Sequence, residues 1–472
     1  MRLTFDRLWL WIAIALPAFV ALLVPLPAVD LAYQVRAGNE ILATGAIPRM
    51  DTWTFTVAGT PWLDQQWLAQ VALALGFNLG GWELLAVLRA AVIGAMLGLV
   101  IATGIARGAS PRTAAVLALV SFALAAPALA LRPQLFGLLL FALLLWLVAS
   151  RTRHPRAYLL APLVVALWAN VHGSFVLGPA LLAYAWLSDV VARRPARRTL
   201  WILVAGTAAT LLNPFLAGVW PYAAGIGANP AIAGQVSEWQ RTALLAMPGI
   251  LFYPSVVVTA VLLVRHRSRV PLPDWILAAA MAFLGAWAVR GVAWWALAMP
   301  FVLAAALADG RTASREPGPS TDARRARRAS RVNGAIAALL GVLIVVALPW
   351  WRPPDPLTGR TGLLSYAPSG LAAEVGTLPR DVTRVLVPQT WGSWFEWAAP
   401  NARVFIDSRF ELFPADVWDD YRRLAAGGTD AAEVLDRWLV EAVVVPAGQP
   451  PPAGAWDRVY ADADGALYVR HR

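Results

Sequence analysis

The chain has 472 residues, of which 59% are hydrophobic and only 14% are charged, against about 25% charged in a typical soluble domain. Such a chain could not cover its apolar surface in water, so the composition excludes a soluble globular protein and predicts a multi-pass membrane protein. All 39 basic side chains are arginine and there is no cysteine, which excludes disulfides, thiolate chemistry, lysine Schiff bases and a Walker lysine. The net charge of +11 does not indicate a nucleic-acid partner, because the arginines cluster in short loops between apolar runs, as in membrane proteins.

Eleven apolar segments follow one another along the chain and predict a mainly α-helical membrane bundle of about eleven transmembrane helices. The first follows a basic start, as in a signal peptide, but it is long and no clear small-x-small cleavage site precedes Asp30, so we interpret it as an uncleaved helix. Several segments are shorter than the roughly 20 residues that a bilayer core requires, so their ends are approximate. The segments are 8–27, 82–105, 112–130, 134–150, 157–170, 174–192, 200–220, 249–264, 273–289, 291–309 and 333–351.

Clusters of arginine predict the orientation of these helices. They lie within residues 2–7, 107–112, 151–156, 193–198, 265–269 and 311–331. All of them fall on one side of the membrane if all eleven segments span it, and the positive-inside rule makes this side the cytoplasm. We therefore expect a membrane protein with a cytoplasmic N-terminus and an extracytoplasmic C-terminus. The Arg-, Ser- and Pro-rich loop at 311–331 is expected to be disordered.

The same pattern predicts two domains, a membrane domain over 1–351 and a soluble extracytoplasmic domain over 352–472. The tail holds 12 Arg against 16 Asp plus Glu, a balance that suits translocation. Its short β-branched runs alternate with helical segments, which predicts an α/β fold with a small, partly parallel sheet. The expected strands are 382–387, 403–407, 442–445 and 466–469, and the expected helices are 415–424 and 429–439.

Polar residues concentrate in the first extracytoplasmic loop, 28–81. Asp30 stands directly after the first apolar segment, and the following residues predict a loop helix over about 31–43 that Gly45 would end. A short strand is expected over Thr52–Val57. Two tryptophans, Trp62 and Trp67, would anchor a second loop helix at the membrane interface.

Carboxylates and arginines at this membrane surface are candidates for chemistry. A carboxylate can act as a general base on an acceptor hydroxyl, and an arginine can hold a lipid phosphate and stabilise it as a leaving group. The arginines expected near the outer surface are Arg36, Arg132, Arg241 and Arg290. Two of them, Arg132 and Arg290, lie in very short hairpins between helices, where an arginine is costly unless it snorkels or meets a partner.

Each candidate also has a purely structural interpretation. Asp30 could cap a helix end, and Asp51 could cap the turn before the expected strand. Arg132 and Arg290 could extend to lipid headgroups. The segment 168–173 could be a structural turn. Glu238, next to a tryptophan, could anchor the interface.

Several short motifs resemble those of bacterial membrane proteins related to GT-C glycosyltransferases. The first loop carries Asp30-x-x-Tyr33-x-x-Arg36-x-Gly38, followed by Gly45-x-x-Pro48-x-x-Asp51, Gly59-x-Pro61-Trp62 and Gln66-Trp67-Leu68. Further similar motifs lie at Leu131–Gln134, Trp168–Gly173, Glu238–Trp239 and Val404–Leu412, with Tyr421 after the last. The superfamily includes protein O-mannosyltransferases and lipid A aminoarabinose transferases, and the resemblance covers most of the chain.

This resemblance implies an inverting transferase that moves a sugar from a polyprenyl-phosphate-linked donor to an acceptor hydroxyl on a glycan, lipid or protein. Asp30 matches the catalytic base that follows the first helix in the superfamily, and Asp51 is the best match to a second acidic residue that supports catalysis or metal binding. A divalent cation, Mg²⁺ or Mn²⁺, is a candidate cofactor, although no residue is assigned as a metal ligand and Gln66 stands where some relatives have glutamate. The residues expected to bind substrate or its phosphate are Tyr33, Arg36, Arg132, Asn170, His172, Glu238, Arg241 and Arg290.

Two other functions stay open on the sequence. A lipid or solute transporter would show inverted repeats and ionisable residues in mid-membrane, whereas this chain keeps its charges at the ends of helices. A non-catalytic assembly or sensor protein would use the tail to bind a partner in the cell envelope. Membrane lipids are expected partners in every case.

Overall fold

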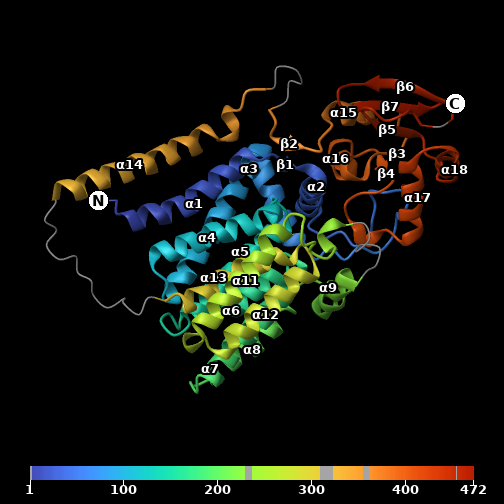
Figure 1. The fold of residues 1–472 in the computed structure, drawn as a ribbon. Coiled ribbons are helices and arrows are strands. Elements are labelled where there is room, and N and C mark those ends of the chain that lie inside the picture. Colours follow the sequence, from blue (N-terminus) through green and yellow to red (C-terminus); the bar gives the residue numbers. More distant parts are fainter. Residues whose placement is uncertain (1–2, 229–235, 309–322, 355–360, 453, 472) are drawn as a thin grey trace. The chain divides into compact units, whose positions relative to one another are not determined.

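The computed structural model (Figure 1) describes residues 3–228, 236–308, 323–354, 361–452 and 454–471. The chain is mainly helical and divides into two compact units. The first unit is formed by the described residues within 1–24, 86–223 and 236–351. The second is formed by those within 25–85, 224–235 and 352–472. The polar first loop therefore belongs to the same unit as the tail.

Apolar helices build the first unit. They are α1 (Phe5–Leu23), the second part of α3 (Trp67–Ala106), α4 (Pro111–Ala125), α5 (Pro133–Ser150), α6 (Ala161–Ala169), α7 (Leu177–Val191), α8 (Arg197–Ala209), the first part of α9 (Val219–Ala228), α11 (Gly249–Arg265), α12 (Leu272–Trp287), α13 (Gly291–Ala306) and α14 (Ala323–Val346). Proline stands in the first turn of α4 and α5, where its missing N–H is tolerated. Nearly every residue of α13 is buried, because α4, α5, α11 and α12 pack around it.

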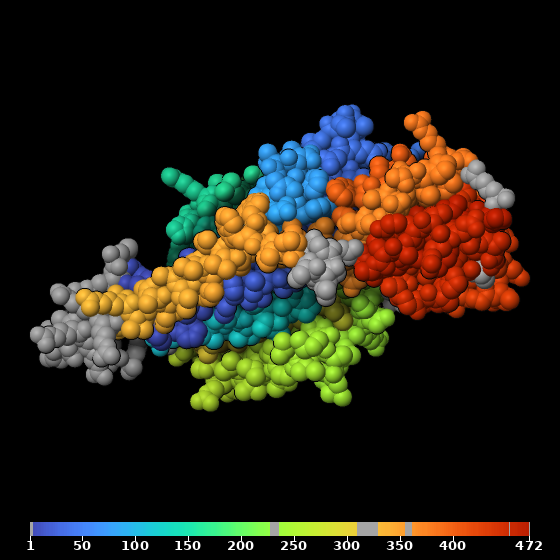
Figure 2. Space-filling view, turned by 90° about the horizontal axis from the view of Figure 1, so that it is seen from above, coloured from blue at the N-terminus to red at the C-terminus, as the bar shows by residue number. Residues whose placement is uncertain are grey.

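Six helices are long and apolar enough to cross a membrane, and five shorter apolar helices accompany them among the described residues. Each of the eleven predicted segments contains a helix, which supports a membrane location. Helix α14 packs against α1, and its apolar side chains are otherwise exposed on the surface of the unit (Figures 1 and 2). Such a surface suits lipid. The exposed residues include Leu339, Val342, Val345 and Val346.

Three segment boundaries differ from the prediction. The expected helix over 200–220 is two helices, α8 and α9, because Pro214 has no N–H for a helix and Asn213 instead accepts from the Phe215 N–H (2.7 Å). Helix α3 begins at Trp67 and continues into the membrane segment across a kink at Gly80 and Gly81. The predicted disordered loop at 311–331 lies mostly outside the described residues, but from Ala323 it is the helical start of α14.

A five-stranded sheet organises the second unit. Its order is β4-β3-β5-β7-β6, with β3 parallel to β4 and β5, and β7 antiparallel to β5 and β6. The predicted partly parallel sheet is confirmed, although β6 was not predicted. The strands are β3 (Arg384–Leu386), β4 (Arg403–Val404), β5 (Ala442–Pro446), β6 (Trp456–Ala461) and β7 (Gly465–Arg470).

Helices cover both faces of this sheet. Alternate residues of β5 point to opposite faces, so Ala442 and Val444 join one hydrophobic cluster while Val443 and Val445 join another. The first cluster packs α2 (Ala28–Thr44), α15 (Ser369–Thr377) and α16 (Gln389–Ala398) against the sheet, and the second packs α17 (Ala415–Ala426) and α18 (Thr429–Arg437). The loop helix α2 is thus a core element of the tail.

The first loop connects α2 to α3 and contacts the tail. Helix α2 ends at Gly45, whose φ of 68° is the left-handed conformation that glycine favours, as predicted. The expected strand over Thr52–Val57 does not form. Only an isolated parallel bridge joins Thr54 to Val404, because Asp51 takes the N–H groups of this segment into a capped turn.

Candidate functional site

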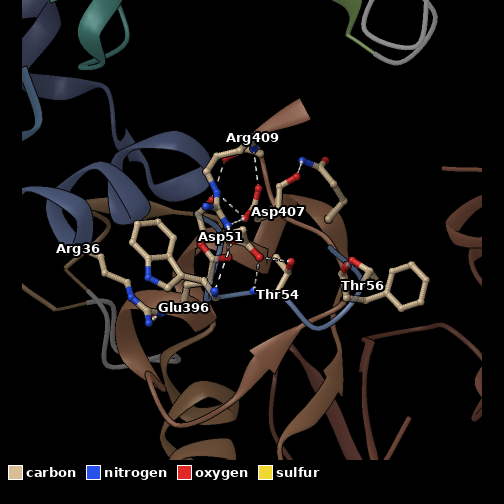
Figure 3. A network of polar contacts seen from close by, with 12 residues as sticks. Arg36, Asp51, Thr54, Thr56, Glu396, Asp407 and Arg409 are labelled. Atoms are coloured by element: carbon tan, nitrogen blue, oxygen red, sulfur yellow. Dashed lines mark hydrogen bonds and ion pairs between the residues drawn. The ribbon is translucent and has the colours of Figure 1, made fainter. Parts of the chain in front are cut away.

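A buried ionic network lies in the second unit, centred on Arg409 (Figure 3). Its guanidinium donates to Asp51 (2.6 Å) and through Nε to Asp407 (2.8 Å), and it lies 3.5 Å from Glu396. The side chains of all four residues are fully buried. Arg409 also lies 4.5 Å and 4.7 Å from the ring centroids of Trp53 and Trp62. These contacts join the first loop to the tail.

One carboxyl of this network, that of Glu396, has a raised pKa. Burial raises the pKa of Glu396 well above its ordinary value, and the neighbouring Asp407 carboxylate adds to the effect. Neither carboxyl oxygen of Glu396 meets an N–H or O–H donor among the described residues.

Asp51 caps the turn, as its structural interpretation predicts. One oxygen accepts from the Trp53 N–H (3.4 Å), and the other accepts from the N–H (3.2 Å) and hydroxyl (2.6 Å) of Thr54. The Arg409 ion pair adds to these bonds. The oxygens of Asp51 are therefore committed to protein donors, and a catalytic role for Asp51 stays a prediction.

The tail also contacts the backbone just before Asp30, which lies in the first turn of α2. The Leu26 N–H donates to the Leu363 carbonyl (2.8 Å), within a short parallel pairing of β1 (Leu26–Pro27) with β2 (Leu364–Ser365). The Ser408 hydroxyl donates to the Val29 carbonyl (2.7 Å) and contacts the Ser393 hydroxyl (2.7 Å). Two tail segments thus fix the backbone next to Asp30.

Two other predicted loop residues lie close by. The Tyr33 hydroxyl accepts from the Gln34 amide (2.5 Å). Arg36 donates to the Glu396 carbonyl (2.5 Å), and its guanidinium lies 4.7 Å from the Trp53 ring centroid. Arg36 therefore supports the buried network, and its predicted phosphate contact stays a prediction.

A second constellation lies in the first unit and is called the arginine cluster here. It consists of Arg132, Gln134, His172, Glu238 and Arg290. Glu238 faces both arginines, with its Oε1 2.5 Å from Arg132 and its Oε2 3.9 Å from Arg290. The Arg290 guanidinium donates to the Gln134 carbonyl oxygen (3.4 Å), and its backbone N–H donates to the Glu238 carbonyl (3.0 Å). Three predicted residues from distant hairpins thus meet.

His172 contributes a neutral ring to this cluster. Its Nδ1 accepts from the Ser174 N–H (3.2 Å), which places the ring proton on Nε2. Burial lowers the pKa of His172 well below its ordinary value, and the charges of Arg290 and Arg132 lower it further. Gln134 adds a second neutral donor, since its buried amide nitrogen meets no acceptor in the part of the chain that the structure describes.

Two predicted binding residues make other contacts. Asn170 donates to the carbonyls of Ala166 and Leu212, both at 2.8 Å, which fits the structural turn. The Arg241 guanidinium lies 5.8 Å from the Trp287 ring centroid.

Five residues of these two networks were not predicted as site residues from the sequence: Gln134, Glu396, Asp407, Ser408 and Arg409. The sequence signal for Glu396 was its position as a single charged residue between Phe395 and Trp397, in a helix rich in aromatic residues.

The structure does not fit a divalent cation at Asp51. Its oxygens already accept from Arg409 and Thr54, and no group of three or more His, Cys, Asp or Glu side chains among the described residues is arranged to hold a metal ion.

The carboxyl of Asp64, in the first loop, has a raised pKa. Burial raises its pKa to about 7, although a hydrogen bond from Gln70 (2.7 Å) and the charge of Arg409 act in the opposite direction. The unfolded chain loses this proton near pH 4, so stability should fall by up to about 1.4 kcal/mol per pH unit as the pH rises from 4 to 7. Asp64→Asn should remove this slope, as thermal unfolding in detergent from pH 4.5 to 8.5 would measure. The exposed Asp430→Asn is the control, and parallel profiles for Asp64→Asn and the wild type would contradict the prediction.

Solved structures resemble this chain in fold. The oligosaccharyltransferase from Archaeoglobus fulgidus aligns over 94% of this chain and 69% of its own, with a TM-score of 0.56 and 13% identity. The aminoarabinose transferase ArnT from Cupriavidus metallidurans aligns over 97% of both chains, with a TM-score of 0.53 and 15% identity. These neighbours are GT-C glycosyltransferases. The chain has a GT-C fold.

The mycobacterial arabinofuranosyltransferase AftD also aligns with this chain, with a TM-score of 0.54 and 18% identity. The alignment covers 98% of this chain but only 41% of AftD. At these identities the likeness concerns the GT-C fold alone. No family model matches the sequence, and no curated protein matches it at a significant level. The predicted GT-C-like membrane bundle with a C-terminal α/β region is therefore confirmed by structure and not by sequence.

Proposed function

We propose that this GT-C protein is an inverting glycosyltransferase that takes a sugar from a polyprenyl-phosphate donor and transfers it to an acceptor hydroxyl. The arginine cluster carries the proposal, because Arg132, Glu238 and Arg290 come from three separate connections between helices, and the sequence predicts that they bind substrate or its phosphate. Guanidinium groups are the usual partners of phosphate oxygens. One structure of the archaeal neighbour AglB contains a dolichol-phosphate, which supports the donor class.

The proposed reaction assigns one role to each group of residues. Asp30 takes the proton of the acceptor hydroxyl. The acceptor oxygen then forms a bond to the anomeric carbon on the face opposite the phosphate, the carbon–oxygen bond to the phosphate breaks, and the configuration inverts. The phosphate leaves with the bonding electrons, and Arg132 and Arg290 stabilise its added negative charge. Asp51 supports the loop that carries Asp30.

A donor panel tests this function. Purified chain is incubated with a cell-envelope extract and a series of polyprenyl-phosphate sugars, and release of polyprenyl phosphate is measured. One donor should be consumed, and Arg132→Gln should slow its consumption by about 10²-fold or more, as loss of one transition-state donor does elsewhere. Arg422→Gln, on the exposed face of α17, is the matched control. Consumption of no donor, or an equal rate in Arg132→Gln, would overturn the proposal.

One observation favours the non-catalytic alternative, an envelope assembly or sensor protein. The oxygens of Asp51 and the guanidinium of Arg36 contact other protein groups, as purely structural residues would. Binding of the donor without its consumption would support this alternative.

We further propose that the protein lies in the bacterial cytoplasmic membrane with an extracytoplasmic tail. Because the chain has no cysteine, single cysteines report its topology without a background. Asp430→Cys, on the exposed start of α18, should react with a membrane-impermeant maleimide in intact spheroplasts. Arg153→Cys should react only after permeabilisation. The reverse pattern would contradict the proposed orientation.

A further inference from the structure

Arg89 is a charged residue inside an apolar helix. It lies in the second part of α3, within the first unit, and residues 84–106 contain no other charged side chain. It is buried, with an exposed fraction of 2%. An arginine in an apolar membrane segment is costly and is therefore a candidate for a function. Arg89 was not predicted as a site residue from the sequence.

The contacts of Arg89 cap the end of α1. Its Nη2 group donates to the carbonyls of Ala21 (2.5 Å), in the last turn of α1, and of Val24, directly after it. Carbonyls at the end of a helix lack partners within the helix and form the negative end of its dipole, so a cation there is favourable. A glycine often ends a helix, but here Pro25 follows and Val24 is extended, with ψ 134°. A side chain from a neighbouring helix therefore supplies the donors.

A short and stiff connection joins this capped end to Asp30. It consists of residues 25–29, in which Pro25 and Pro27 each have a φ restricted by the proline ring. The pairing of Leu26 and Pro27 with β2 restricts it further. Asp30 follows in the first turn of α2. A connection of this kind cannot absorb a displacement of the end of α1, so the displacement is passed on to the segment that carries Asp30.

We propose that Arg89 is a positioning residue for Asp30, which it serves by fixing the end of α1 from which the Asp30 segment starts. This inference rests on the proposed function and adds a residue that acts through the backbone. A general base must lie within hydrogen-bond reach of the hydroxyl that it deprotonates. A displacement of about 1 Å at a reacting group can lower a rate by about 10²-fold. Loss of the Arg89 contacts should therefore reduce turnover without removing any group that binds the donor.

The first readout of the test needs no activity. Because the chain has no cysteine, Asp30→Cys and Arg153→Cys, in an exposed loop of the first unit, can carry a pair of spin labels. Pulsed EPR of the full chain in nanodiscs should give a narrow distance distribution that Arg89→Met broadens and Arg89→Lys broadens less. The control is Arg107→Met combined with Asp274→Asn. It removes a buried ion pair directly after the other end of α3 and should leave the distribution narrow.

The second readout is turnover of the chain without labels on the donor found in the panel. Arg89→Met should lower turnover by about 10–10²-fold, whereas its affinity for the donor should change little, because the phosphate is assigned to the arginine cluster. A loss confined to turnover is the kinetic mark of a group that matters in the transition state only. Arg89→Lys should recover most of the loss. The control pair should keep the turnover of the wild type per folded molecule.

Several outcomes would overturn the inference. They are a distribution that Arg89→Met leaves narrow, a broadened distribution with turnover unchanged, and a loss of donor affinity as large as the loss of turnover. If Arg89→Met does not fold, Arg89→Gln, which keeps an N–H donor, should give the same two effects in smaller size, and wild-type behaviour of this variant would contradict the proposed role. If the wild type consumes no donor, the proposed function fails, while the distance distributions still decide whether Arg89 fixes the Asp30 segment.

Discussion

Replacing Asp30 with asparagine should slow sugar transfer by about 10²–10⁴-fold, the usual contribution of a positioned general base. Asparagine keeps the size of the side chain but cannot take the proton of the acceptor hydroxyl. Donor binding should change little, because the phosphate is assigned to the arginine cluster. Initial rates and donor affinities of the purified variant, measured on the donor found in the panel, separate the two effects.

The matched control for Asp30→Asn is Asp416→Asn. Asp416 also lies in the first turn of a helix, α17, and its side chain is exposed. Both substitutions remove a favourable interaction with the helix dipole, worth at most about 1 kcal/mol at a surface position. Only Asp30→Asn should lose turnover. Transfer at the wild-type rate in Asp30→Asn would remove this residue from the role of base.

Replacing Arg409 with methionine should destabilise the protein by about 3–5 kcal/mol, the size observed when one partner of a buried ion pair is removed. The substitution leaves the carboxylates of Asp51 and Asp407 buried without their shared cation, and it removes the charge that lies over Trp53 and Trp62. Chemical unfolding followed by tryptophan fluorescence would report the change, because both tryptophans contact this side chain.

Arg422→Met is the control for this prediction. Arg422 pairs with Asp419 on the surface, where both side chains are 55% exposed, and such substitutions usually change stability by less than about 0.5 kcal/mol. The double variant Arg409→Met with Asp51→Asn should recover part of the loss, because one unpaired charge is then absent. A loss in Arg409→Met no larger than in Arg422→Met would show that the network does not stabilise the fold.

Local sequence patterns predicted most of the elements because their causes are local. Apolar segments that need about 20 residues to cross a bilayer appear as helices, and Gly45 ends α2 because glycine accepts a positive φ. The helices α17 and α18 begin at the predicted residues. The errors came where one polar side chain redirects the backbone, as Asp51 does with the expected strand at Thr52–Val57 and as Asn213 does before Pro214.

The sites were predicted unevenly because their contacts are long-range. Arg132 and Arg290 could be predicted as site residues because an arginine in a short hairpin between membrane helices requires a partner. Glu238 is a partner of both. In contrast, no local pattern links Asp51 to Arg409, which lies 358 residues later. Ser408 could not be predicted for the same reason, because its hydroxyl donates to the Val29 carbonyl, which is distant in sequence.

The bond between Ser408 and Val29 spans 379 residues, and this separation has a consequence for biosynthesis. The segment that carries Asp30 leaves the ribosome long before its supports in the tail, which are made more than 300 residues later. During translation the first loop therefore lacks its contacts with the tail while the intervening membrane helices are inserted. A chain that stops before residue 352 would keep every apolar helix and still lack the tail contacts that support the Asp30 segment.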